Sequence, residues 1–384
     1  MISVLLVGIG GYGGLTAAEM LKNGAEHGAQ VVGVVEPYPE NSPVKDMLGS
    51  IPVYSKIEDF YKEHKADIAV LSTPIHLHKE QAVLAMEKGS DVLCEKPIAP
   101  TLQDAYEMLE ASKKYNKNLH IGFQLSFAPS ILALKKDIMD GKYGKITAMH
   151  SAVCWPRGSA YFARPWAAKR KINGQWVLDS IMMNACAHYL HNMLFLAGSE
   201  LSKAAEPIKL GACLFRANDI ETFDTAFVEA TLEDGVKVRY NVSHATEANI
   251  DPVTRISMEN GTAYINESGG DEGAYVILPD GSKKVYGATY KDRYEKLWYA
   301  FDVFKGEKTA VCTVETALPH LKCVNAVSEK CEVRVFDKIE TKDETRFFKG
   351  LDIMIQKAFD EDKMPEKYEN ETVIDLGNYK EFKG

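Results

Sequence analysis

The chain has 384 residues, of which 46% are hydrophobic and 26% charged, so its composition is globular and its length exceeds one hydrophobic core. Its net charge of −9 argues against nucleic acids and anionic membranes as partners, because both attract basic surfaces. Seven cysteines without a C-x-x-C pair are typical of reduced, mostly buried thiols. The N-terminus lacks the basic region of a signal peptide, and no apolar run reaches the roughly 20 residues of a membrane span, so we expect a cytoplasmic protein.

The first third of the chain alternates short apolar runs with helix-like segments, a pattern typical of a parallel sheet covered by helices. We expect strands at residues 2–7, 30–36, 51–54, 67–72, 91–95 and 118–123. The expected helices lie between these strands, at 12–25, 57–64, 77–89 and 101–116.

The pattern changes near residue 123, where we place the boundary between two domains, 1–123 and 124–384. A helix is expected at 129–140, and longer strands with short turns then predict a mostly antiparallel sheet. These strands are expected at 145–154, 207–217, 222–231, 236–244, 253–258 and 261–266, with later helices at 183–197, 290–305, 314–330 and 348–360. The predicted fold class is α/β, a doubly wound parallel sheet followed by an α+β domain with an open sheet.

A glycine-rich turn joins the first expected strand to the first expected helix. It has the G-x-G-x-x-G spacing of a dinucleotide-binding motif, formed by Gly8, Gly10 and Gly13 with Gly11 and Tyr12 between them. Such glycines let a pyrophosphate approach the free N–H groups at the helix N-terminus. Glu36 ends the second strand, where its carboxylate would bind ribose hydroxyls and repel the 2′-phosphate of NADP. We therefore expect NAD as cofactor; the alternative is an ordinary glycine turn beside a surface glutamate.

The ends of the fourth and fifth strands bring polar residues to the same edge of the sheet, where ligands bind. Those closing the fourth strand are expected to contact the cofactor: Ser72, Thr73, Pro74 and His76. Lys96 follows the fifth strand, and there it could hydrogen-bond to the reacting oxygen of an alcohol while a hydride leaves the carbon. The alternative for Lys96 is a surface ion pair with Glu95.

Further motifs accompany these residues: Gly122-Phe123-Gln124, Phe127-x-Pro129 and Gly141-x-x-Gly144-Lys145-Ile146. Together they resemble the Gfo/Idh/MocA family, the relatives of glucose–fructose oxidoreductase and inositol dehydrogenase, well over residues 1 to about 150 and more loosely beyond. The resemblance implies a Rossmann domain, followed by a domain whose open sheet covers the active site and often builds the oligomer. We expect Glu95, Lys96 and Gln124 among the cofactor contacts, and a homodimer or homotetramer.

The family usually carries an aspartate four residues before a histidine on a helix, and this pattern is interrupted here. Asp179 fits the segment that leads into the motif, whereas His188 fits the histidine and has Asn184 four residues before it. On one helix, Asn184, His188 and His191 would share a face. We expect His188 as general acid/base, with substrate contacts from Asp179, Asn184 and His191. The alternative for His188 is a packed helix histidine, and the residue in the family's aspartate position stays open between Asp179 and Asn184.

A basic and aromatic loop precedes this region and contains Tyr161, Arg164 and Trp166. These side chains could stack on a sugar ring or bind a carboxylate or phosphate. A solvated loop around a buried tryptophan is the commoner explanation. No metal site is expected, because His188 and His191 are spaced i, i+3 without a clear third ligand.

The resemblance implies an NAD-dependent oxidoreductase that transfers a hydride between nicotinamide and a hydroxyl-bearing carbon of a sugar, cyclitol or related polyol. Lys96 and His188 would be its catalytic residues. Two alternatives stay open: glycoside cleavage by transient oxidation and elimination without net redox change, and a non-catalytic NAD-binding sensor.

Overall fold

The computed structural model describes residues 1–290 and 294–384, which form two compact units. The first unit comprises Met1–Ala99, Gln103–Gln124 and 294–315; the second comprises Pro100–Leu102, 125–290 and 316–384. The predicted boundary at 123 lies next to the end of one of these segments. The return of residues 294–315 to the first unit was not indicated by the sequence. The predicted helix at 290–305 includes residues 291–293, which lie outside the described residues.

A parallel sheet forms the centre of the first unit. Its strands are β1 (Ile2–Val7), β2 (Ala29–Val35), β3 (Val53–Tyr54), β4 (Ile68–Leu71), β5 (Asp91–Cys94) and β6 (Leu119–Ile121). Every residue of β4 is buried, as expected for a strand covered on both faces. Over the described residues, the strand order is β3-β2-β1-β4-β5-β6, and all neighbours pair in parallel. The order reverses between β1 and β4, which is where a doubly wound sheet binds its ligand.

Helices of the first unit pack against this sheet: α1 (Gly11–Asn23), α2 (Ile57–Glu63), α3 (His78–Glu87), α4 (Leu102–Tyr115) and α8 (Glu295–Phe304). α8 comes from far along the chain, yet Leu297 and Phe301 belong to the same buried cluster as Val4 and Leu6 of β1. The Trp298 indole also donates a hydrogen bond to the Glu19 carboxylate of α1 at 3.0 Å. The first unit is therefore discontinuous in sequence.

A larger mixed sheet organises the second unit. Its strands are β7 (Ile146–Cys154), β10 (Pro207–Arg216), β11 (Thr225–Leu232), β12 (Lys237–Ser243), β13 (Ile250–Met258), β14 (Gly261–Asn266), β15 (Ala274–Ile277), β16 (Lys283–Gly287), β17 (Val333–Val335) and β20 (Thr372–Asp375). Over the described residues, the order is β16-β15-β14-β13-β7-β12-β11-β10-β17, with β20 also on β10. Most pairs are antiparallel, and β7–β12 and β10–β17 are parallel. The predicted fold class is confirmed in both units.

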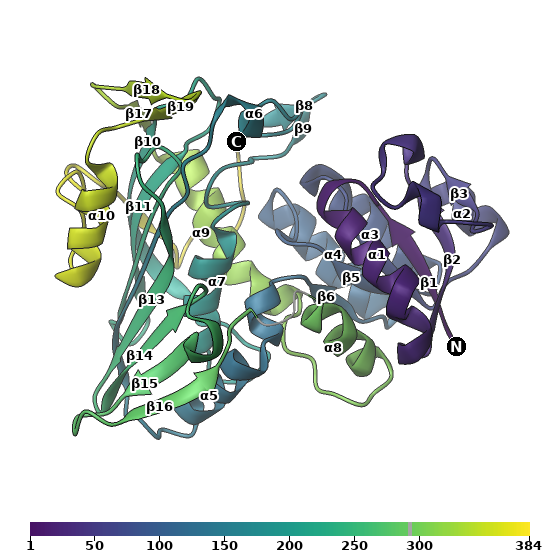
Figure 1. Ribbon diagram of the computed structural model, residues 1–384, viewed down its shortest axis with the longest axis horizontal. Helices are drawn as coiled ribbons and strands as arrows, with labels where there is room; N and C mark the ends of the chain where they lie inside the picture. Colours follow the sequence, from purple (N-terminus) through teal and green to yellow (C-terminus); the bar gives the residue numbers. More distant parts are fainter. Residues whose placement is uncertain (291–293) are drawn as a thin grey trace. The chain divides into compact units, whose positions relative to one another are not determined.

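The second unit also contains helices and two short hairpins: α5 (Pro129–Met139), α6 (Ser159–Phe162), α7 (Ala187–Leu196), α9 (Val314–Lys330), α10 (Leu351–Asp360), β8 (Lys171–Ile172) with β9 (Gln175–Trp176), and β18 (Glu340–Lys342) with β19 (Thr345–Phe347). Short 3-10 helices occur in both units, at Gly24–His27, Pro39–Asn41, Lys45–Met47, Ile75–Leu77, Gln124–Phe127 and Gly270–Glu272. Figure 1 shows α7 and α9 on one side of the large sheet and α10 on the other.

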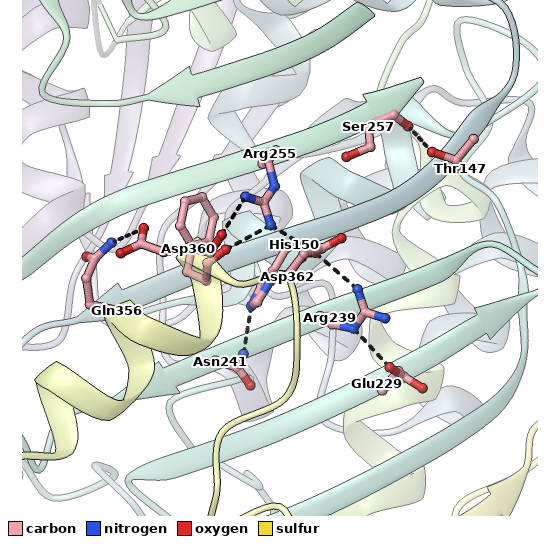
Figure 2. A network of polar contacts seen from close by, with 11 residues as sticks. Thr147, His150, Glu229, Arg239, Asn241, Arg255, Ser257, Gln356, Asp360 and Asp362 are labelled. Atoms are coloured by element: carbon pink, nitrogen blue, oxygen red, sulfur yellow. Dashed lines mark hydrogen bonds and ion pairs between the residues drawn. The ribbon is translucent and has the colours of Figure 1, made fainter. Parts of the chain in front are cut away.

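The segment after α10 is joined to the outer face of this sheet by ion pairs. The Asp362 carboxylate lies 3.1 Å from Arg239, 3.0 Å from Arg255 and 3.4 Å from His150 Nδ1, as Figure 2 shows. These three partners come from β12, β13 and β7. On the opposite ring nitrogen, His150 Nε2 accepts a hydrogen bond from the Asn241 amide at 2.8 Å. One carboxylate therefore pairs with arginines of β12 and β13 and lies beside a histidine of β7, the strand between them.

None of the helices in the described residues is long and apolar enough to cross a membrane. The seven cysteines are all free thiols, and six of them are buried. The prediction of reduced, mostly buried thiols is confirmed.

Candidate active-site residues

The glycine turn after β1 has the conformation that its sequence predicts. Gly8 has φ +83°, and a Cβ there would lie 2.7 Å from the Ser72 carbonyl oxygen. A Cβ on Gly13 would lie 2.3 Å from the Gly8 carbonyl oxygen, so only glycine allows this close packing of helix on strand. Gly10 is exposed at the N-terminus of α1 and provides no side-chain cap, which leaves helix N–H groups for an anion. This turn fits the pyrophosphate of a dinucleotide.

Glu36 lies beside the same turn, directly after β2. Its Oε2 accepts a hydrogen bond from the Ile9 N–H at 3.1 Å, and its Oε1 accepts one from the Tyr38 N–H at 3.2 Å. A Cβ on Gly10 would be 3.8 Å from the Glu36 carboxylate, so the two residues are neighbours. The carboxylate is thus held next to the turn, in the place from which it could contact a ribose.

A buried histidine connects the loops that follow β4 and β5. The two ring nitrogens of His78 lie 2.8 Å from the Thr73 carbonyl oxygen and 2.9 Å from the Pro97 carbonyl oxygen. Burial lowers the pKa of His78, and a neutral imidazole has only one N–H, so the ring donates to one of these two carbonyl oxygens at a time. The Thr73 hydroxyl donates to the Gln81 side chain at 2.5 Å. His78 therefore holds the Thr73–Pro74 segment close to the segment that carries Lys96.

Lys296 is a buried cation at this sheet edge that the sequence did not reveal. Its ammonium pairs with the Glu95 carboxylate, lies 3.5 Å from the Gly122 carbonyl oxygen, and sits 4.8 Å from the centroid of the Tyr12 ring. Burial alone would lower the pKa of Lys296, but the Glu95 charge raises it above its ordinary value. No local signal could have found this residue, because it is 201 positions from Glu95 in an otherwise ordinary amphipathic helix.

Two other predicted cofactor contacts, His76 and Gln124, lie in short 3-10 helices that follow strands of the parallel sheet. His76 lies in the 3-10 helix after Pro74, and burial lowers the pKa of its imidazole, with the nearby His78 adding to the effect. Gln124 begins the 3-10 helix after β6. Their roles, like those of Ser72, Glu95 and Lys96, stay predictions.

In the second unit, Asp179 and Asn184 lie together. The Asn184 amide donates to Asp179 Oδ1 at 3.0 Å, and the Ala168 N–H donates to Asp179 Oδ2 at 2.6 Å. The prediction that Asn184 shares a helix face with His188 is wrong, because α7 begins only at Ala187 and residues 181–186 form turns. The apolar run around residue 182 resembles a helix, but its backbone bends before the helix starts.

His188 and His191 both lie on α7 and are buried, at 8% and 0% exposure. His191 Nε2 is 2.9 Å from the Ser126 hydroxyl, and its ring stacks on Phe195 with centroids 6.1 Å apart. Burial lowers the pKa of His191 well below its ordinary value, so its ring is neutral. These are the contacts of a core residue, and the expected contact of His191 with substrate stays a prediction.

The aromatic and basic loop forms a stacked group around Tyr161. The Arg164 guanidinium carbon lies 4.2 Å from the centroid of the Tyr161 ring and 4.4 Å from that of Trp166. The guanidinium carbon of Arg157, a residue that the motifs did not indicate, lies 5.1 Å from the centroid of the same Tyr161 ring. Trp166 is half-buried.

Among the described residues, no group of three or more His, Cys, Asp or Glu side chains is arranged to hold a metal ion.

Two family models match the chain. Residues 2–123 match the model described as "Oxidoreductase family, NAD-binding Rossmann fold", and residues 131–264 match the model described as "GFO/IDH/MocA C-terminal domain". Together these matches cover more than half of the chain. The chain belongs to the Gfo/Idh/MocA family. Its first unit is thus an NAD-binding Rossmann domain of that family, which confirms both the resemblance and the predicted cofactor.

Curated members of the Gfo/Idh/MocA family differ in how much of the chain they match. The 2,7-anhydro-N-acetylneuraminate hydratase of Mediterraneibacter gnavus is 32% identical, but the match covers only 37% of this chain and 37% of that protein. The inositol 2-dehydrogenase of Corynebacterium glutamicum is 23% identical over 78% of this chain and 86% of the relative.

Among solved structures of the Gfo/Idh/MocA type, the WlbA dehydrogenase from Bordetella pertussis, in complex with NADH and UDP-GlcNAcA, matches with a TM-score of 0.68. The sequences are 23% identical, and the match covers 85% of this chain and 95% of that one. This likeness shows the fold that the two proteins share.

Proposed function

We propose that the protein is an NAD-dependent oxidoreductase acting on a hydroxyl-bearing carbon of a sugar, cyclitol or related polyol. The observation that carries this proposal is the arrangement in the first unit. A glycine turn at the N-terminus of α1 lies beside Glu36, and Lys96 follows β5 of the same sheet in a segment held by His78. The family membership and the inositol dehydrogenase relative support the choice of substrate class.

The proposed roles follow from the chemistry of alcohol oxidation. NAD, when bound, accepts the hydride from the carbon that carries the hydroxyl. The hydroxyl must lose its proton as the hydride leaves, and the Lys96 amine would hydrogen-bond to this oxygen and stabilise its developing charge. His188 would act as acid/base, and the Asp179–Asn184 pair would orient substrate hydroxyls. Glu36 and the glycine turn would hold the ribose and the pyrophosphate.

A second candidate keeps the same residues but ends without net redox change. In this reaction the sugar is oxidised transiently, a bond to the ring is eliminated, and the hydride returns. The hydratase relative favours it, because hydration is not a net oxidation. This reaction would be identified if mass spectrometry detects an eliminated product while NADH does not accumulate.

Lys96→Ala tests both candidates. With a panel of polyols and sugars, turnover should fall by at least 100-fold while NADH binding, followed by its fluorescence, stays within a factor of two or three. Lys88→Ala is a matched control, since this lysine is exposed and pairs with Glu87 at the surface. Full activity of Lys96→Ala would exclude the proposed role of the lysine, and a wild-type protein that binds NADH but converts no substrate would favour a sensor.

A further inference from the structure

Two arginines of the second unit lie against the same tyrosine. The guanidinium carbons of Arg157 and Arg164 are 5.1 Å and 4.2 Å from the centroid of the Tyr161 ring. Each also contacts a tryptophan: Arg157 is 5.7 Å from the Trp155 ring, and Arg164 is 4.4 Å from the Trp166 ring. Planar guanidinium groups stack on aromatic faces, so these rings restrict the positions of both cations. Two positive charges are thus held around one aromatic side chain.

Neither guanidinium is neutralised by the residues that the structure describes. Arg157 Nε and Arg164 Nη2 are buried, and over the described part of the chain neither atom has a hydrogen-bond partner. Arg164 Nε donates to the Tyr161 carbonyl oxygen at 3.0 Å, and the Arg164 side chain also hydrogen-bonds to the Tyr161 side chain, but neither contact uses Nη2. A buried donor without a partner costs about 1–3 kcal/mol, and more when the group is charged. The two unpartnered donors therefore reduce the stability of the folded chain, and a bound anion that accepts their hydrogen bonds would offset this cost.

Two other arginines of the same unit differ from Arg157 and Arg164 in having a carboxylate partner. Arg239 and Arg255 both pair with the Asp362 carboxylate, at 3.1 Å and 3.0 Å. These two guanidinium groups therefore have a carboxylate partner. Among the described residues, no carboxylate forms an ion pair with Arg157 or Arg164.

The arginines lie near residues proposed to act on substrate. Burial raises the pKa of Tyr161, and the Asp179 charge raises it further, so this carboxylate acts directly on the tyrosine between the two cations. On the other side, the Trp155 ring lies 5.8 Å from the ring of Tyr189, which follows His188 on α7. The two donors therefore belong to the same region of the second unit as Asp179 and His188.

We propose that Arg157 and Arg164 form an anion subsite that binds a carboxylate or phosphate group of the substrate. The proposal rests on the proposed function and narrows its substrate from any polyol to a sugar acid or sugar phosphate. Guanidinium groups bind carboxylates and phosphates through paired N–H donors and opposite charge. A neutral hydroxyl group of a sugar lacks the negative charge and binds them less strongly. The stacked aromatic rings would contact the apolar face of the sugar.

Matched ligands test this subsite in the full chain with NADH present. D-glucuronate and D-glucose 6-phosphate carry the two anionic groups, and D-glucose carries neither. We expect at least one of the anionic sugars to bind the wild type at least tenfold more tightly than D-glucose, as measured by calorimetry and by the shift in Tm. The preference of one anionic sugar over the other distinguishes the carboxylate from the phosphate.

Arg157→Gln and Arg164→Gln should each reduce this preference by a factor of ten or more. Arg334→Gln is the matched control, because this substitution removes a similar charge elsewhere in the unit. The Arg334 guanidinium carbon lies 4.5 Å from the centroid of the Phe215 ring, and its Nη1 donates to the Glu369 carbonyl oxygen. Circular dichroism and NADH binding of each variant show whether it is folded.

Three results would overturn the subsite: equal affinity for D-glucose and both anionic sugars, no measurable binding of either anionic sugar, or an unchanged preference in both arginine variants. A different result would reject the proposed function, namely that the wild-type protein does not bind NADH. Binding of an anionic sugar without NADH binding would therefore retain the subsite and reject the oxidoreductase.

Discussion

The Lys296 ammonium and the Glu95 carboxylate form a buried ion pair within the first unit, at 3% and 13% side-chain exposure. Glu95 precedes Lys96, so the pair fixes the backbone from which the proposed catalytic lysine extends. The pair also lies beside Tyr12 of the glycine turn. A residue of α8 is thus connected to two segments that are expected to bind the cofactor.

Lys296→Met should destabilise the first unit by about 3–5 kcal/mol, because it leaves a buried carboxylate without its cation. The double variant Lys296→Met with Glu95→Gln should recover most of this loss. Urea unfolding measures both effects. Lys305→Met is the control: this more exposed lysine directly follows α8 and pairs with Asp302, and its loss should cost less than about 1 kcal/mol. Equal losses in the two single variants would contradict a special role for the buried pair.

Glu267 should make the protein less stable as the pH rises. Burial raises the pKa of its carboxyl to about 7, although a hydrogen bond from the Tyr189 hydroxyl at 3.0 Å opposes the shift. Between the ordinary pKa of 4.5 and this value, the folded chain holds a proton that the unfolded chain has released, so stability falls with rising pH. Glu267→Gln should be more stable than the wild type by about 1–3 kcal/mol at pH 8 and nearly equal to it at pH 5. Thermal unfolding at both pH values measures this difference.

The exposed Glu272 provides the control for this prediction, since its side chain is 64% exposed and pairs with Lys283 at the surface. Glu272→Gln should show the same stability difference from the wild type at both pH values. A pH-independent effect of Glu267→Gln would show that its carboxyl titrates normally.

His150 should have the opposite dependence on pH. Burial lowers the pKa of its imidazole to about 4, so between pH 6.5 and 4 the unfolded chain binds a proton that the folded chain does not. Stability is therefore lost as the pH falls through this range, by about 2 kcal/mol between pH 7 and pH 5. His150→Gln keeps an acceptor for the Asn241 amide and cannot titrate, so its unfolding free energy should fall less over this range. Identical slopes for variant and wild type would reject the assignment.

Asp179 should contribute more to stability than its partner Asn184. Asp179→Asn places an amide where the carboxylate accepts the Ala168 N–H and the Asn184 amide, so one of these hydrogen bonds is lost and a buried donor faces another donor. The expected cost is about 1–3 kcal/mol. Asn184→Ala removes one donor and leaves the contact with Ala168, so it should cost less. Chemical unfolding of both variants measures the order, and the reverse order would place the structural role on Asn184.

The sequence predicted the elements that depend on local patterns. Alternating apolar runs located the strands of the first sheet and, in the second, β7 and β10 to β14, but not β15, β16, β17 and β20. Glycine spacing located the turn in which only glycine fits at positions 8 and 13. It failed where tertiary contacts decide the structure. The segment around Asn184 has the composition of a helix but bends to bring its amide to Asp179. Lys296 and Arg157 acquire their partners from distant segments, so no window of sequence contains the relevant information.

The discontinuity of the first unit has a consequence for biosynthesis. Leu297, Ala300 and Phe301 complete the cluster that covers Val4 and Leu6, yet they are translated long after the parallel sheet has left the ribosome. Until α8 is made, the nascent Rossmann sheet exposes part of its apolar surface while the strands β7 to β16 of the second unit are synthesised. Synthesis from the N-terminus therefore finishes the cofactor domain late, and a chaperone that shields apolar surface would act during this interval.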